Sequence, residues 1–574
     1  MKIYQLKIKN FRGVKEATFK FSSPLVCLIG LGDSTKTTIL DAIEYVLCPN
    51  WFIPIDDSDF TDCDISENIE ITATVGPVTE DFKSVYVKYG SDLRGWDKGK
   101  NELHDEPAEG DIHVLSIRLT IDNTLAPEWS VVSNRFQDEH HISYRDRQTL
   151  GVSKIRDNID AELAWTRGSS LLRMSKDRKE AEKVLLEANR TLREIGLTDA
   201  SFNSLNESIK SAKKRGKKYG INTKNLKANI DPKNLRGNTS TISLHDGDVP
   251  FRRMGLGTRR LMSIGLQLSD TEEGAILLID EIEQALEPHR LKHLLRTLKK
   301  SMEKPGCGQI FMTTHSPATL EELGAEGVYC VHYDSDNKKT NVDLIKPETQ
   351  GTIRRIPKAF LSPKIIVCEG QTEIGLLRAF EKQQIARNGY EYSFAYNKTT
   401  IVNGEGSSQA PERAYHLALN KYSACLLIDS DELASWKVNE ADLIKAGVKI
   451  ARWDENYKTE MQICMNIPLD SVLHIIELAI SLNSNLNEDK VLDSINSGLS
   501  CTVSTVAEIK NHIGEENNLR IAVAKSASNN DWFKNITYAE KLGDYLFDEI
   551  YDKIKDAEFY KRFLLMQNWA RNEQ

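Results

Sequence analysis

The 574-residue sequence has few of the features that mark membrane, secreted or zinc-binding proteins. No apolar run approaches the roughly 18 to 20 residues that a helix needs to span a bilayer. The nine cysteines form no CxxC pair and no His/Cys cluster at zinc spacing, which indicates small buried thiols in a reducing compartment. The first six residues alternate apolar and polar side chains as a strand does and contain no signal-peptide apolar block. We therefore expect a cytoplasmic protein with no membrane partner.

The sequence also lacks an excess of basic residues. Its 75 Lys and Arg against 84 Asp and Glu give a formal net charge of −9, which argues against a surface that is basic throughout. Any DNA path must then be a local basic stripe. Lys213–Lys218 is the best candidate, followed by Arg252-Arg253 and Arg259-Arg260. A solvated helix end is the alternative reading of the lysine run.

A phosphate-binding loop lies near the start of the chain. The apolar run Leu25–Ile29 predicts a buried strand, and an apolar-striped helix follows the loop, which is the context that a P-loop requires. The predicted ATP-binding residues of this loop are Gly30, Gly32, Lys36, Thr37 and Thr38. Lys36 would reach the β and γ phosphate oxygens, and the Thr37 hydroxyl would ligate Mg²⁺.

One position departs from the usual GxxxxGK[ST] pattern, because Thr35 stands where the second glycine is expected. A positive φ at this position would strain a β-branched residue. We therefore expect a slow, switch-like ATPase.

Three later segments follow in the order of an ABC ATPase. Gly255 and Gly257 open a helix that can grip the γ-phosphate of a nucleotide held by a second subunit. An apolar strand over 275–279 ends in Asp280 and Glu281, where Asp280 would hold Mg²⁺ through water and Glu281 would orient or deprotonate the attacking water. The next strand ends at His315, whose imidazole can sense the γ-phosphate.

Acidic residues follow two apolar strands in the last third of the chain. The run 364–368 precedes Glu369 and Glu373, and the run 424–428 precedes Asp429 and Asp431. Alternate residues of a strand point to one side, so Asp429 and Asp431 can share a metal while Ser430 points away. Parallel strands place such carboxylates around one crevice. Mg²⁺ or Mn²⁺ suits ligands that are all oxygen.

These motifs carry a resemblance to a known family. The segment Lys7–Gly13 looks like the first strand of the RecF/SMC-like ATPases. Gly255–Arg260, Asp280–Pro288 and Thr314–Pro317 together resemble the OLD (overcoming lysogenization defect) family. In that family an ABC-type ATPase, interrupted by a helical dimerisation insert, precedes a Toprim domain, and Glu-Gly…Asp-x-Asp is similar to the Toprim pattern. The resemblance implies a homodimer or higher oligomer that holds ATP between P-loop and signature element.

The predicted fold class is α/β, an ABC/RecF-SMC-like P-loop ATPase followed by a Rossmann-like Toprim domain. The predicted ATPase covers 1–145 and 246–345, the helical insert for dimerisation 146–245, a linker 346–362, and the Toprim nuclease domain 363–574. Within the insert, Lys176–Leu197 has the pattern of an amphipathic helix, whose apolar stripe faces either a core or a second subunit.

The resemblance assigns metal ligation to Glu369, Glu373, Asp429 and Asp431. A later ligand is predicted at Glu460, with Asp454 and Glu455 as alternatives. A lysine that stabilises negative charge at the scissile phosphate is predicted at Lys534, with Lys525 as the alternative.

The implied function is an ATP-binding and ATP-hydrolysing, Mg²⁺- or Mn²⁺-dependent DNA endonuclease gated by its nucleotide. The alternative is a nucleotide-dependent DNA-binding sensor or scaffold whose degenerate Toprim domain acts through a partner. OLD-like proteins in anti-phage defence include Gabija nucleases and retron-associated effectors. The expected partners beside DNA are therefore a retron reverse transcriptase with its noncoding RNA–DNA, or a helicase-like defence protein.

Overall fold

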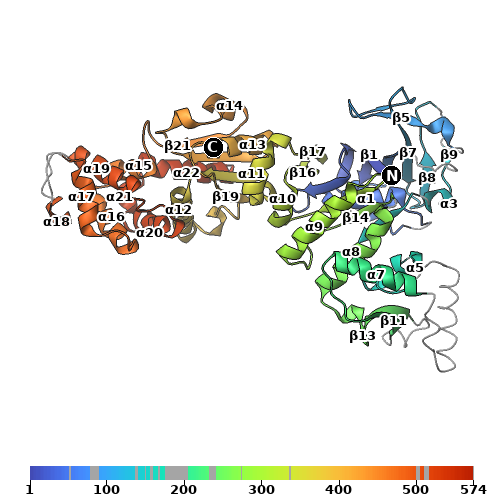
Figure 1. Cartoon of the computed structure of the whole chain (residues 1–574). Helices are drawn as coiled ribbons and strands as arrows, with labels where there is room; N and C mark the ends of the chain where they lie inside the picture. The colour runs from blue at the N-terminus through green and yellow to red at the C-terminus, as the bar shows by residue number, and fades with distance from the viewer. Residues whose placement is uncertain are drawn as a thin grey trace. The chain divides into compact units, whose positions relative to one another are not determined.

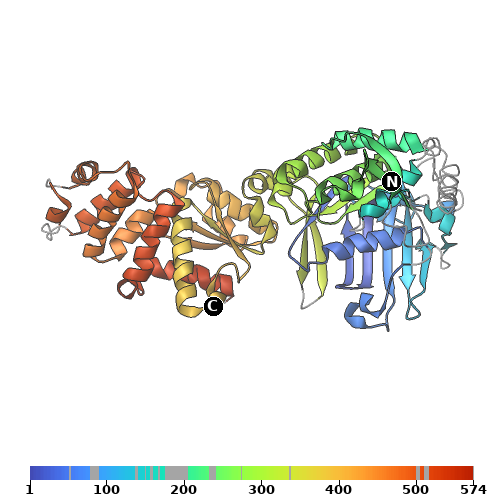
Figure 2. The same cartoon turned by 90° about the horizontal axis from the view of Figure 1, so that it is seen from below.

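The computed structural model forms two compact units, Met1–Ile345 and Lys346–Gln574 (Figures 1 and 2). It describes residues 1–50, 53–77, 89–135, 140–148, 150–155, 159–165, 169–174, 205–231, 241–272, 274–334, 338–499, 504–509 and 516–572. Within these ranges, no helix is both long and apolar enough to cross a bilayer.

The first unit contains an eight-stranded antiparallel sheet in the order β2-β1-β4-β7-β5-β6, to which β8 and β9 attach beside β7. Its strands are β1 (Lys2–Phe11), β2 (Val14–Lys20), β4 (Ile69–Gly76), β5 (Arg94–Asp97), β6 (Glu102–His104), β7 (Ile112–Ile121), β8 (Pro127–Val131) and β9 (His140–His141). Apolar and polar residues alternate along β1 and β2, which is typical of a sheet with one buried face.

A second sheet of this unit has the order β10-β14-β15-β3-β16-β17 and is parallel except where β16 meets β17. Its strands are β3 (Leu25–Ile29), β10 (Val152–Ile155), β14 (Ile276–Ile279), β15 (Gln309–Thr313), β16 (Val328–Asp334) and β17 (Lys339–Leu344). The strands β3, β14 and β15 are buried along their whole length, as their continuous apolar runs predict.

Helix α1 (Lys36–Leu47) packs between the two sheets, because it contacts β1, β4 and β7 of the first and β10 and β15 of the second. Its apolar residues Ile39, Leu40, Ile43 and Val46 have no exposed surface. This packing fixes the P-loop, which joins the end of β3 to the start of α1.

Several helices and a small sheet complete the first unit. The helices are α3 (Tyr144–Gln148), α4 (Ile159–Glu162), α5 (Ser170–Arg173), α7 (Asn206–Lys218), α8 (Leu256–Glu272), α9 (Pro288–Met302) and α10 (Pro317–Leu323). The antiparallel strands are β11 (Leu226–Asp231), β12 (Thr241–Asp246) and β13 (Val249–Pro250).

The predicted helical insert, 146–245, differs from the structure in two respects. Strand β10 lies inside this range but pairs in parallel with β14 of the ATPase sheet, and β11 and β12 form a hairpin rather than helices. Strand β10 has only four residues, and its partner follows about 120 residues later, so its pattern gives no local signal. The predicted helix Lys176–Leu197 lies outside the described residues.

The predicted linker, 346–362, is also wrong, because it belongs to the second unit. It forms α11 (Gln350–Arg355) and a 3₁₀-helix at Pro357–Leu361. Ile353 and Phe360 have no exposed surface, and the Tyr422 hydroxyl donates to the Phe360 carbonyl oxygen at 2.8 Å. Because most residues of the segment are polar, its sequence does not indicate that these few residues are buried.

The second unit is built on a four-stranded parallel sheet in the order β19-β18-β20-β21. Its strands are β18 (Lys364–Cys368), β19 (Thr399–Asn403), β20 (Ser423–Ile428) and β21 (Lys449–Arg452). The connecting helices are α12 (Gln371–Asn388), α13 (Gln409–Leu419) and α14 (Glu440–Lys445). Because crossovers between parallel strands are right-handed, α12 covers one face and α13 and α14 the other.

The chain ends in a group of helices that pack with α12 into one hydrophobic core. They are α15 (Thr459–Asn466), α16 (Leu469–Leu482), α17 (Glu488–Asn496), α18 (Val506–Ile509), α19 (Glu516–Asn529), α20 (Ile536–Asp544), a π-helical turn at Tyr545–Glu549, α21 (Tyr551–Ile554) and α22 (Glu558–Arg571). The core includes Trp453, which precedes α15, and Trp532 and Phe533, which precede α20. This packing holds both of these segments in place.

Candidate nucleotide and metal sites

The P-loop carries the strain that its sequence predicts. Thr35, at the N-cap of α1, has φ 67° and ψ 12°, a left-handed conformation that costs a residue with a β-carbon about 1–2 kcal/mol. The Thr35 Oγ1 atom lies 3.2 Å from Thr340 Oγ1 of β17, within hydrogen-bond distance. This contact offsets part of the strain and ties the loop to the edge of the sheet.

We expect Thr35→Gly to increase the ATP turnover rate several-fold and to change the free energy of unfolding by less than about 1 kcal/mol. Glycine relieves the left-handed strain, and loss of the hydroxyl contact, a hydrogen bond worth about 1 kcal/mol, offsets that gain. The freed loop adapts to the phosphates more readily. Phosphate release and thermal unfolding measure the two effects. Thr35→Ala is the control, because it keeps the backbone strain and removes the hydroxyl. If Thr35→Ala turned over ATP as fast as Thr35→Gly, backbone strain would not be the cause of the slow turnover.

The P-loop lysine is held by its own loop. Lys36 Nζ donates to the carbonyl oxygens of Gly30 at 3.1 Å and Leu31 at 2.5 Å, and to Ser34 Oγ at 3.2 Å. Burial lowers the pKa of Lys36, while nearby carboxylates, led by that of Asp280, oppose this shift. The ammonium group is therefore placed where a phosphate oxygen can replace the carbonyl partners.

The acidic turn after β14 is fixed by β15 and by the helix that follows the signature glycines. The Thr313 hydroxyl donates to the Asp280 carboxylate, and Thr313 Oγ1 accepts from the Glu281 amide at 2.8 Å. Arg260 of α8 is 2% exposed and donates to the carbonyl oxygens of Asp280 and Glu281, at 2.5 and 2.9 Å. This contact holds Glu281 at φ 46°, another left-handed position.

The segment around the two predicted signature glycines packs against the turn after β14 on one side and is exposed on the other. A β-carbon on Gly257 would lie 2.3 Å from the Ala285 carbonyl oxygen, so this glycine allows close packing against the turn after β14. Gly255 is open, since a β-carbon placed there would have no atom within 4 Å, and Leu256 is 44% exposed. Arg259 pairs with Asp160 at 2.6 Å. The prediction of a DNA stripe at Arg259-Arg260 is wrong, because both side chains bind protein groups.

The backbone of His315, the predicted switch histidine, is held by Glu283, a residue that was not predicted for this site. Glu283 accepts from the His315 amide at 2.6 Å and from the Thr314 hydroxyl at 2.7 Å, and the His315 side chain is exposed. Glu283 lies two residues after Glu281 in the quoted motif, and this spacing after an acidic turn was the available signal.

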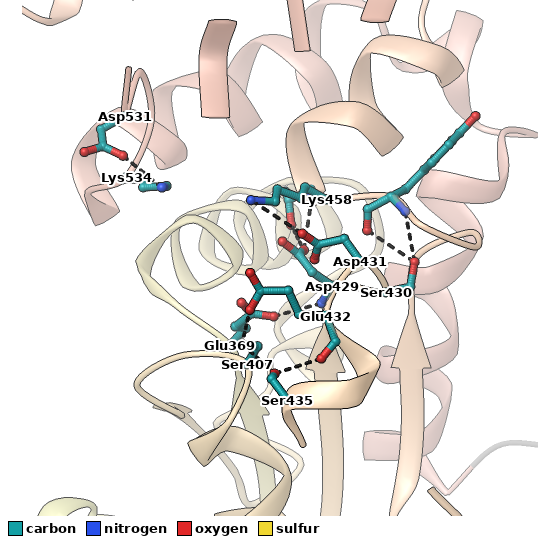
Figure 3. Close-up of polar contacts among 12 residues, drawn as sticks. Glu369, Ser407, Asp429, Ser430, Asp431, Glu432, Ser435, Lys458, Asp531 and Lys534 are labelled. Carbon is teal, nitrogen blue, oxygen red and sulfur yellow. Dashed lines mark hydrogen bonds and ion pairs between the residues drawn. The ribbon is translucent and has the colours of Figure 1, made fainter. Parts of the chain in front are cut away.

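In the second unit, the predicted acidic residues lie together. A cavity of about 340 Å³ opens at the carboxyl ends of the parallel strands, and its lining includes all six residues predicted for this site, namely Glu369, Glu373, Asp429, Asp431, Glu460 and Lys534. The first four follow β18 and β20, Glu460 is the second residue of α15, and Lys534 precedes α20. Figure 3 shows Glu369, Asp429 and Asp431 close to one another above the strand ends.

A threonine links two of these carboxylates. The Thr459 hydroxyl lies 2.6 Å from Glu373 Oε1 and 2.9 Å from Asp429 Oδ1, and it accepts from the Trp453 indole at 2.7 Å. The Thr459 amide also donates to Asp429 Oδ1, and Glu369 accepts from the Asp429 amide, both at 3.0 Å. Thr459 was not predicted, although it lies directly before Glu460, which was.

Burial makes this cluster electrostatically unfavourable without a cation. It raises the pKa of Glu369 to about 7, with Glu373 and Asp431 adding to the effect, and it raises the pKa of Asp429 well above its usual range. Burial likewise raises the pKa of Glu460 to about 7. Like charges this close cannot all remain ionised unless positive charge is supplied.

Two lysines supply part of that charge. Lys458 Nζ lies 3.4 Å from Asp431 Oδ2, and Lys534 Nζ lies 2.8 Å from Asp531 Oδ1, as Figure 3 shows. Lys458 was missed, as were Glu405 and Glu432 in the cavity lining. The alternatives lie elsewhere, since Asp454 binds the Gln462 side chain and Glu455 and Lys525 are exposed outside the lining.

The donors of the cavity fit a hard divalent cation, because its charged ligands are carboxylate oxygens without Cys or His. In the conformation described, no three His, Cys, Asp or Glu side chains of the described residues are arranged to hold one ion. Glu369 Oε2 and Asp429 Oδ1 each accept a hydrogen bond from a protein amide, and neither of these bonds involves the second oxygen of the carboxylate.

Comparison with known proteins bears first on the ATPase unit. The family model described as "AAA domain, putative AbiEii toxin, Type IV TA system" matches residues 25–321, more than half of the chain. The chain belongs to this family. The matched range of this AAA-domain family contains the P-loop, the acidic turn after β14 and His315, so the ATP-binding assignment of the first unit rests on the whole constellation.

The AAA-domain chain is also similar to an OLD nuclease from Thermus scotoductus, at 23% identity over 386 residues. That match covers 62% of this chain and 66% of that protein, slightly less than two thirds of its length, and it confirms the resemblance to the OLD family. Among solved structures, an Smc head bound to the C-terminal winged-helix domain of ScpA has a TM-score of 0.38 at 13% identity, covering 60% of this chain and 97% of that one. The SMC head domain from Thermotoga maritima has a TM-score of 0.33 at 10% identity, covering 60% and 100%.

Proposed function

We propose that this protein is an ATP-binding, divalent-metal-dependent DNA endonuclease of the OLD type, with a Toprim-like nuclease centre in the second unit. One observation carries the proposal. Carboxylates that follow β18 and β20, a carboxylate of α15 and the Lys534 side chain all line one cavity. Similarity to an OLD nuclease supports the same reading.

In this proposal Glu369, Asp429 and Asp431 hold Mg²⁺ or Mn²⁺, with Glu373 and Glu460 as further ligands. Such ions supply Lewis acidity and lower the pKa of bound water. The chain itself positions these groups, since Thr459 orients Glu373 and Asp429, and the strand ends fix Glu369 beside Asp429. Lys534 would stabilise negative charge at the scissile phosphate, and Lys458 would neutralise Asp431 between turnovers.

The first unit would bind ATP and Mg²⁺ through Lys36, Thr37 and Asp280, with Glu281 acting on the attacking water. We further propose that two copies of the chain sandwich ATP between the P-loop of one and the open Gly255 face of the other, and that nucleotide state gates cleavage. A role in anti-phage defence, with a reverse transcriptase or helicase-like partner, follows from the family resemblance.

A plasmid-cleavage assay tests the proposal. We expect supercoiled DNA to be nicked or linearised with Mg²⁺ or Mn²⁺, and cleavage to stop when EDTA is added in excess. Parallel reactions with ATP and with a non-hydrolysable analogue reveal the gating.

A second candidate is a nucleotide-dependent DNA-binding sensor whose degenerate nuclease half acts through a partner. It is favoured by the absence of a ready three-residue metal site among the described residues. DNA binding without cleavage, under every combination of metal and nucleotide, would favour this candidate over the nuclease.

A further inference from the structure

The outer face of α7 carries four lysines, Lys210, Lys213, Lys214 and Lys217, which we name the lysine stripe. All four are exposed, and among the residues that the structure describes none of them forms an ion pair or hydrogen bond. Their spacing of three, four and seven residues places them on one side of the helix. The stripe is thus a fixed row of positive charge in a protein whose net charge is −9.

The opposite face of α7 is packed tightly against α8, which holds the stripe in place. Ser208, Ala212 and Gly216 are buried. A β-carbon on Gly216 would lie 2.9 Å from Met262 Cε, so any larger residue would have to displace the Met262 side chain of α8. Arg215 also donates to the Gly265 carbonyl oxygen at 3.4 Å. Helix α7 therefore presents the stripe away from α8.

The neighbouring helix α9 shows that this unit does provide acidic partners elsewhere. The C-terminal end of α7 lies beside α9, since His293 Nε2 of α9 is 2.8 Å from the Lys218 carbonyl oxygen. Yet Lys292, Arg296 and Lys299 of α9 pair with Glu321, Glu322 and Glu326, at 2.9, 2.7 and 3.5 Å. Like charges at the spacings of the lysine stripe repel and destabilise a helix, so the missing negative charge is expected from a ligand.

We propose that the lysine stripe binds the phosphate backbone of double-stranded DNA. Seven residues of helix span about 10 Å, which matches about three phosphates of one strand at their axial spacing. A membrane surface fits poorly, because the apolar side that an interfacial helix would insert is buried against α8. The identity of the ligand rests on the proposed function, whereas the charge pattern does not.

The test is duplex binding by the full chain carrying Asp429→Asn, so that cleavage does not consume the DNA. Lys210, Lys214 and Lys217 are replaced together by Gln. The matched control replaces Lys292, Arg296 and Lys299 by Gln, which removes the same charge from the paired helix. Fluorescence anisotropy with a duplex of about 30 base pairs is recorded over a series of salt concentrations.

Each lost phosphate contact reduces the slope of log affinity against log salt by about 0.9. Between about 50 and 200 mM salt, the affinity of the parent should therefore fall roughly 40-fold more than that of the stripe variant. The control should keep the slope of the parent. The stripe variant should melt no lower than the parent, because only repulsive charges are removed.

An unchanged salt slope in the stripe variant, or an equal change in the control, would overturn the proposal. So would a slope that changes for single-stranded RNA but not for duplex DNA. The two proposals fail separately. Cleavage is assayed separately, with Asp429 intact. Duplex binding through the stripe without any cleavage by that protein contradicts only the nuclease, and cleavage together with an unaltered salt slope contradicts only the stripe.

Discussion

Asp429→Asn should reduce metal-dependent DNA cleavage at least about 1,000-fold, a loss of about 4 kcal/mol of transition-state stabilisation. Asn keeps the shape of the side chain, and its amide oxygen can still accept from the Thr459 amide. It removes the negative charge, however, and this charge is the reason for placing a carboxylate at the end of β20. Single-turnover cleavage of plasmid DNA at saturating Mg²⁺ measures the effect.

The same variant should bind ATP with the affinity of the parent, because Asp429 belongs to the second unit and the P-loop to the first. Glu455→Gln is the matched control, since Glu455 is an exposed acidic residue outside the cavity lining. This control should cleave as the parent does. Full cleavage by Asp429→Asn, still dependent on metal, would refute the assignment of the nuclease centre.

Glu460→Gln should stabilise the metal-free protein at pH 8 by on the order of 3 kcal/mol, although it should also impair cleavage. Burial raises the pKa of Glu460 from an ordinary value of 4.5 to about 7. Between these two pH values, the unfolded chain releases the proton while the folded protein keeps it. Each pH unit of that difference is worth about 1.4 kcal/mol, so the parent loses stability as pH rises from about 4.5 to 7.

The advantage of Glu460→Gln should therefore vanish near pH 4.5, grow up to about pH 7 and stay constant above it. Urea unfolding in EDTA across this range measures the curve. Glu455→Gln should show no such pH dependence, because Glu455 is exposed. A Glu460→Gln protein that is less stable than the parent at pH 8 would show that the carboxylate is adequately compensated by Lys534 and Lys458.

The parts of the fold that could be predicted are those whose signals are local. The apolar strands before the P-loop, before Asp280, before Glu369 and before Asp429 are buried strands, because a continuous apolar run followed by a turn has few other stable placements. Carboxylates at the ends of parallel strands meet at one edge of the sheet, which is why the acidic cavity follows from the sequence once the strands are placed.

The parts that could not be predicted depend on partners distant in sequence. Strand β10 is recognised only through its pairing with β14. The burial of Arg260 depends on carbonyl groups about 20 residues later in the chain. From the sequence, the glycines and arginines at the start of this helix indicated only a ligand-binding role and not this structural one. Thr459 is held in the site by hydrogen bonds with Trp453 and with the carboxylates of two other segments.

The strand order of the first unit has a consequence for synthesis on the ribosome. Strand β3 is complete at residue 29, but both of its neighbours, β15 and β16, begin only at residues 309 and 328. At the usual 5 to 20 residues per second, its edges stay unpaired for roughly 15 to 60 s while the intervening chain is made. An apolar strand exposed for so long is prone to aggregation, so lower growth temperatures or chaperone co-expression should raise the yield, and fragments that end before residue 345 should not fold.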